Sequence, residues 1–75
     1  INPLTKKERI NAIQAEKIMN NMIKKANKNN DFNTITIKNY LVTCIYTTQL
    51  YEYEAVALLK EFLLNGSLSF NKYNL

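Results

Sequence analysis

The side chains best suited to chemistry in this sequence are cationic, and they gather in its first third. Residues 1–28 carry seven lysines and arginines against two glutamates, a net charge of +5, whereas the whole chain has a net charge of +4. Amines and guanidinium groups neutralise phosphates, and this neutralisation supplies much of the affinity of DNA-binding proteins. We therefore expect the partner to be a polyanion, and specifically double-stranded DNA.

The groups that usually carry catalysis are scarce. The chain has no histidine, one cysteine and one glycine, so it contains neither a metal-ligand spacing nor a phosphate-cradling glycine loop. Glu52 and Glu54 are two residues apart on a predicted helix and face different ways. Cys44 lies in an apolar helical pattern, which favours a small core residue over a redox group. We predict no enzyme activity, no cofactor, no metal and no small-molecule substrate.

The length and composition indicate one small intracellular domain. Seventy-five residues suffice for a single domain, which we place over residues 1–75. No apolar run approaches the roughly 18 residues that span a bilayer, and no signal-peptide pattern opens the chain. A lone cysteine favours a reducing, cytoplasmic setting, and the lack of a spanning apolar run predicts no membrane partner.

The basic residues lie on a predicted amphipathic helix from Thr5 to about Lys28. Thr5 and Glu8 have the spacing of a capping box, in which each satisfies an orphan backbone N–H group. The predicted apolar side comprises Ala12, Ala15, Met19, Met22, Ile23 and Ala26. The opposite side comprises Lys6, Lys7, Lys17, Lys24, Lys25 and Lys28. Such a side is either an ordinary solvated helix face or a surface that tracks phosphates.

The middle of the chain combines two patterns. Residues 32–37 alternate and are mostly β-branched, which predicts a short strand from Phe32 to Ile37. A helical stripe then follows, with Thr36 as its N-cap. It consists of Ile37, Tyr40, Leu41, Cys44 and Ile45. Because this second helix is rich in β-branched residues, a strand remains its alternative.

A third helix is predicted from about Leu50 to Leu64. It follows a turn at residues 47–49, in which Thr47 or Thr48 can serve as its N-cap. Its predicted buried side comprises Tyr51, Ala55, Val56, Leu58, Leu59, Phe62 and Leu63. Gly66 is the expected left-handed residue that ends the helix. Residues 67–75 then alternate polar and apolar, as in a hairpin whose turn is Asn71-Lys72.

This order of elements resembles that of the winged helix-turn-helix proteins. The matching stretch is residues 58–70, LLKEFLLNGSLSF, which looks like a recognition helix running into a wing. The resemblance implies an α+β, mostly helical fold with three helices, a short strand between the first two, and a C-terminal β-hairpin wing. It also implies DNA binding, in a plasmid or phage process such as transcription regulation, replication or conjugative plasmid transfer.

The third helix departs from the family because residues 50–64 have a net charge of −2, which repels phosphates. The DNA contacts are therefore assigned to the first helix and the wing, whose tip suits an AT-rich minor groove. They are Lys6, Lys7, Arg9, Lys17, Lys24, Lys28, Asn71, Lys72 and Tyr73. The exposed apolar residues of the first and third helices predict a homodimer. Its interface is assigned to Ile10, Ile13, Gln49, Tyr53, Ala57 and Leu64. The alternative is a protein-interaction module, an adaptor or host-inhibitory phage protein, without a nucleic-acid ligand.

Overall fold

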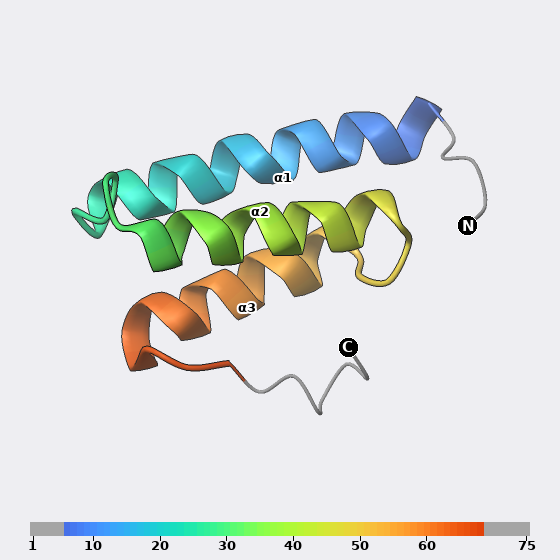
Figure 1. Cartoon of the computed structure of the whole chain (residues 1–75). Helices are drawn as coiled ribbons and strands as arrows, with labels where there is room; N and C mark the ends of the chain where they lie inside the picture. The colour runs from blue at the N-terminus through green and yellow to red at the C-terminus, as the bar shows by residue number, and fades with distance from the viewer. Residues whose placement is uncertain (1–5, 69–75) are drawn as a thin grey trace.

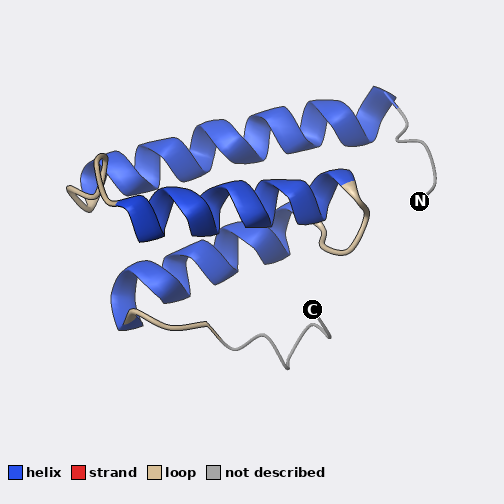
Figure 2. Ribbon diagram, in the orientation of Figure 1, coloured by secondary structure: helices blue, strands red, loops and turns tan. Residues whose placement is uncertain are grey.

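The computed structural model describes residues 6–68, apart from the side chain of Glu8, and these residues form a bundle of three helices. The helices are α1 (Lys6–Lys25), α2 (Phe32–Tyr46) and α3 (Glu52–Asn65). Consecutive helices run in opposite directions, and each packs against the other two (Figure 1). Figure 2 shows that the described part of the chain is built of helices and loops alone.

The predicted α+β winged helix-turn-helix fold is therefore wrong, and the described chain is all-α. The predicted strand, Phe32 to Ile37, forms the first turns of α2. The predicted wing falls mainly on residues 69–75, which lie outside the described residues; Ser67 and Leu68 are not part of a strand. Thr5, the predicted cap of α1, also lies outside the described residues.

Asp31 explains why α2 begins before the predicted position. Its carboxylate accepts the backbone N–H of Thr34 at 3.0 Å, and its carbonyl accepts the N–H of Ile35 at 3.0 Å. This bond to Thr34 lowers the pKa of Asp31, since it favours the charged carboxylate. Asp31 is thus the N-cap of α2, in place of the predicted Thr36.

The threonines of α2 are compatible with a helix because their hydroxyl groups bond within it. Thr36 Oγ1 donates to the carbonyl of Phe32 at 2.8 Å. Thr43 Oγ1 donates in the same way to the carbonyl of Asn39 at 2.9 Å. A bond to the carbonyl four residues earlier satisfies the hydroxyl group without breaking the helix.

Each helix is followed, within one or two residues, by a residue in the left-handed conformation. Asn27, Thr48 and Gly66 have φ angles of 60°, 60° and 74°. At Asn27 and Thr48 the next N–H group reaches back five residues, from Lys28 to the Ile23 carbonyl at 2.9 Å and from Gln49 to the Cys44 carbonyl at 2.8 Å. These bonds satisfy carbonyls that a helix end leaves unpaired. The predicted stop at Gly66 is confirmed, whereas α1 ends at Lys25 rather than near Lys28.

The core takes one stripe from each helix. Its largest fully buried hydrophobic side chains are Met19 of α1, Leu41 of α2, and Leu58 and Leu59 of α3. The predicted apolar side of α1 is confirmed except at Ala26, which is exposed. The predicted side of α3 is wrong at Tyr51, which is 71% exposed.

Lys38 is buried at the helical position between Thr34 and Leu41. Its side chain is only 10% exposed, and Nζ donates to Glu16 Oε2 of α1 at 2.9 Å. Buried ammonium groups require such a partner because the loss of water disfavours the charge. The pair therefore joins α1 to α2 at the edge of the core.

Removal of Glu16 should lower the stability of the fold more than removal of Lys38, the lysine with which it pairs. We expect Glu16→Ala to lower the free energy of unfolding by about 1–2 kcal/mol, since the Lys38 ammonium loses its acceptor. Lys38→Met has a similar length and needs no acceptor, so it should change stability by less than about 1 kcal/mol. Urea unfolding measures both. A Glu16→Ala variant as stable as the wild type would show that water can replace Glu16 as the acceptor.

The left-handed backbone conformation of Thr48 leads to a second prediction about stability. A β-branched residue at φ 60° is strained, so Thr48→Gly should raise the free energy of unfolding by about 0.5–1 kcal/mol, despite the added freedom of glycine in the unfolded chain. Thr47 has φ −93° and its hydroxyl bonds the Thr43 carbonyl at 3.0 Å. The control Thr47→Gly should therefore lower stability. Thermal melts of the two variants should shift in opposite directions.

Candidate functional site

The side of α1 that faces away from the core carries a stripe of lysines and isoleucines at helical spacing. We call this stripe the α1 outer face, and it consists of Lys6, Ile10, Ile13, Lys17 and Lys24, all of which are exposed. The two isoleucines are 47% and 48% exposed. Their predicted exposure is therefore confirmed.

Charge is distributed unevenly among the helices. α1 carries six lysines and arginines against two glutamates, a net charge of +4. α3 carries three glutamates and one lysine, a net charge of −2. Two ion pairs occur among the described residues, Lys28–Asp31 at 3.6 Å and Lys38–Glu16 at 2.9 Å, and neither involves the α1 outer face. The lysines of this face can therefore serve an external anion.

The predicted DNA contacts do not all share one face. Lys6, Lys17 and Lys24 lie on the α1 outer face, while the helical spacing puts Lys7 and Arg9 to either side of it. Lys28 lies beyond the end of α1, where it pairs with Asp31. The other three predicted contacts lie outside the described residues; they are Asn71, Lys72 and Tyr73.

The exposed side of α3 carries a second stripe. We call it the α3 outer face, and it consists of Tyr53, Ala57, Lys60 and Leu64, all exposed. Tyr53 and Leu64 are 71% and 75% exposed, and the ring of Tyr53 stacks on that of Tyr51 with centroids 5.9 Å apart. By helical spacing, Glu54 and Glu61 flank this face along one edge.

The predicted dimer interface is thus divided between two helices. Ile10 and Ile13 lie on the α1 outer face, whereas Tyr53, Ala57 and Leu64 lie on the α3 outer face. Gln49 belongs to the turn between α2 and α3 and is exposed. Because the two faces point outward from different sides of the bundle, they do not form one continuous patch.

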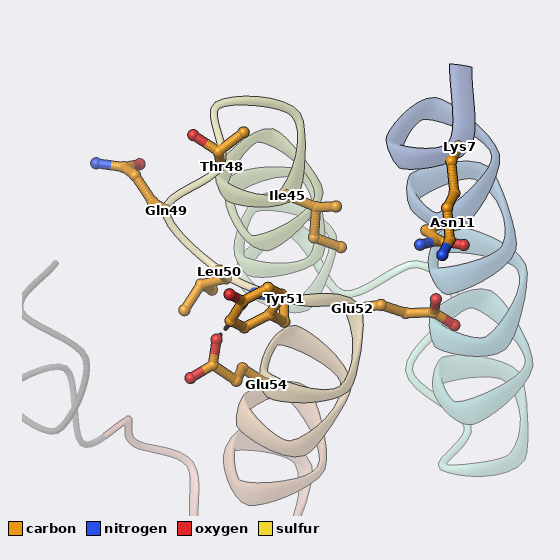
Figure 3. A pocket seen from close by; sticks show the side chains of 9 residues that line it. All are labelled: Lys7, Asn11, Ile45, Thr48, Gln49, Leu50, Tyr51, Glu52 and Glu54. Carbon is orange, nitrogen blue, oxygen red and sulfur yellow. Dashed lines mark hydrogen bonds between the residues drawn. The ribbon is translucent and has the colours of Figure 1, made fainter. Parts of the chain in front are cut away.

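The end of the bundle where α1 begins is hollowed by a depression of about 580 Å³. Figure 3 shows Lys7 and Asn11 of α1 on one side, with Glu52 of α3 extending toward them. The other lining residues are Ile45, Thr48, Gln49, Leu50, Tyr51 and Glu54. Glu54 is already engaged, since its carboxylate accepts the backbone N–H of Tyr51 at 2.8 Å.

The chemistry of this depression is mixed, with one amine, two carboxylates and several neutral groups. Nothing in it selects one ligand charge. Across the described side chains, no group of three or more potential metal ligands converges. The outer faces of α1 and α3 therefore stand out as the candidate binding sites, because each presents exposed apolar residues on a helix with a net charge, positive for α1 and negative for α3.

Cys44 is part of the core rather than of either face. The residue is only 1% exposed, and burial raises the pKa of its thiol. The negative charge of Cys44 in its thiolate form raises the pKa of the neighbouring Tyr40 hydroxyl. A raised thiol pKa lowers the fraction of reactive thiolate at neutral pH. The position of Cys44 therefore fits the predicted packing role.

Comparison of the chain with protein-family models, curated proteins and solved structures gives no match. None of the helices within residues 6–68 is both long and apolar enough to cross a lipid bilayer. A function for this chain is consequently inferred from the two outer faces themselves.

The burial of Cys44 predicts slow reaction with a thiol reagent. In the native protein we expect its rate to be at least about 100-fold below that of the urea-unfolded chain, because the thiol reacts only when the core opens. A matched control is the double variant Cys44→Ala/Ala57→Cys, which moves the thiol to the exposed α3 outer face. This variant should react at nearly the unfolded rate. Fast labelling of native Cys44 would contradict its assignment to the core.

Proposed function

We propose that this domain is a non-enzymatic protein that binds double-stranded DNA through the α1 outer face. The observation that carries the proposal is the alignment of Lys6, Lys17 and Lys24 on one exposed face of a helix with a net charge of +4. A duplex presents a phosphate about every 3.4 Å along each strand, so several lysines on one line can each meet a phosphate.

The helix geometry sets the reach of this contact. At about 1.5 Å per residue, Lys17 and Lys24 are about 10 Å apart along α1, and Lys6 lies about 16 Å before Lys17. Contacts of this kind position a protein on DNA without reading the sequence. The roles of Asn71, Lys72 and Tyr73 in reading an AT-rich site stay predictions.

The α3 outer face is unsuited to the same partner. Its neighbours Glu54 and Glu61 repel phosphates, and Tyr53 and Leu64 offer apolar surface in place of charge. This supports DNA binding by α1 rather than by α3.

A second candidate function is favoured by Ile10 and Ile13. Two half-exposed isoleucines in the centre of the α1 outer face add little to phosphate binding, but they are typical of a surface that contacts another protein. With this function the domain is a protein-interaction module, and its partner offers an acidic, partly apolar surface.

A salt titration of DNA binding tests the first function. Fluorescence anisotropy with a labelled AT-rich duplex, between about 50 and 300 mM salt, gives the slope of log affinity against log salt. The double variant Lys17→Gln/Lys24→Gln should bind all duplexes more weakly and flatten this slope by up to about 1.8, or about 0.9 for each lost phosphate contact.

The matched control is Lys60→Gln, which removes a lysine of the α3 outer face and should leave the slope unchanged. Wild-type protein that fails to bind duplex DNA at the lowest salt would exclude the proposal. It would leave the interaction module as the function of the α1 outer face.

A further inference from the structure

We infer that the α1 outer face of one copy of this chain docks against the α3 outer face of a second copy. Both faces carry exposed apolar side chains. The α1 outer face is basic, whereas the α3 outer face carries one lysine, Lys60, and is bordered along one edge by Glu54 and Glu61, on a helix whose net charge is −2. The small residue Ala57 lies between Tyr53 and Lys60 on this face, and its short side chain leaves room for a side chain of the second copy. The occupant that fits the α3 outer face is therefore the isoleucine-bearing helix of another copy.

The spacing of the charges matches as well as their sign. Lys17 and Lys24 are separated by the same number of residues on α1 as Glu54 and Glu61 are on α3, which is about 10 Å along each helix. The Lys28–Asp31 and Lys38–Glu16 ion pairs, the two found in the described part of the chain, involve none of these four side chains. Glu54 keeps a second carboxylate oxygen beside the one that accepts the Tyr51 N–H.

An antiparallel alignment of the two helices brings the lysines of α1 and the glutamates of α3 together at matching spacing. It sets Lys17 opposite Glu61 and Lys24 opposite Glu54. Ile13 lies one helical turn before Lys17, and Leu64 lies about one turn after Glu61, so the same alignment brings Ile13 to Leu64. In this alignment the Ile13–Leu64 contact lies at one end, and the two ion pairs follow it along the helices.

The contact joins two different surfaces, and this determines how copies can assemble. Each copy offers one α1 outer face and one α3 outer face on separate sides of the bundle. Repetition of such a contact gives either a closed ring or an open chain of copies. The smallest ring is a dimer in which the contact is formed twice. This assembly does not depend on DNA binding, although DNA and a second copy would compete for the α1 outer face.

The test uses one blocked variant for each face. Ile13→Asp places a carboxylate on the α1 outer face, and Leu64→Asp places one on the α3 outer face. Sedimentation analysis from about 10 µM to about 1 mM covers the affinities expected of a small interface. Wild type should associate, and each variant alone should associate at least about tenfold more weakly. A 1:1 mixture should form a heterodimer, because it still contains one intact face of each kind.

The matched control is Phe32→Asp, which adds a carboxylate at a side chain that is 80% exposed and belongs to neither face. It should associate like wild type. Circular dichroism of all variants checks that the helices remain folded. A monomeric wild type at the highest concentration would overturn the inference. So would a mixture of the Ile13→Asp and Leu64→Asp variants that stays monomeric.

Charge reversal gives an independent measurement. Lys17→Glu and Glu61→Lys should each weaken association, by about two- to fivefold for an exposed ion pair. The double variant carries both changes and restores opposite charges across the contact, so it should recover most of the loss. Additive losses in the double variant would contradict the pairing of these two positions.

Failure of self-association and failure of DNA binding can be told apart. Leu64→Asp leaves the lysines of α1 intact, so it should lose association and keep DNA binding. Absence of DNA binding in an associating wild type would remove the proposed function alone.

Discussion

Met19, Leu41, Leu58 and Leu59 come from three different helices, and their joint burial is the constraint on which the rest of the bundle depends. A chain of this size buries a limited fraction of its surface, so the core has no large reserve of stability. Ala12, Ala15 and Ala55 are fully buried and let the helices approach closely. Since each helix packs against both others, no pair of helices holds a core of its own.

The pair of Lys38 and Glu16 shows how a charged residue is accommodated beside this core. The lysine occupies a position that helical spacing assigns to the interior, and its ammonium reaches the half-exposed Glu16 of α1. Burying a charge without a partner costs more than most single contacts contribute. The pair therefore also restricts how α1 and α2 can align, because other registers would separate the two side chains.

With one side of every helix used for the core, binding is left to the outward sides. As a whole α1 has a net positive charge and α3 a net negative charge, and both helices expose apolar residues on their outward sides. A polyanion fits the lysines of α1, whereas a second copy fits both the lysines and the isoleucines. The two partners use the same face, so the balance between them would depend on salt and protein concentration.

Local composition and helical periodicity were enough to predict the apolar stripes of α1 and α3, the stop at Gly66, the concentration of positive charge on α1 and the exposure of Ile10 and Ile13. They could not predict that residues 32–37 are helical, because alternation and helical spacing both fit those residues. The buried side of α2 includes Lys38, and a lysine is normally assigned to the surface from sequence alone. Its burial can be recognised only when its partner on α1, Glu16, is known. The sequence also could not show that the predicted dimer interface is divided between two faces. The packing of the helices decides whether residues that are far apart in the sequence lie on the same surface.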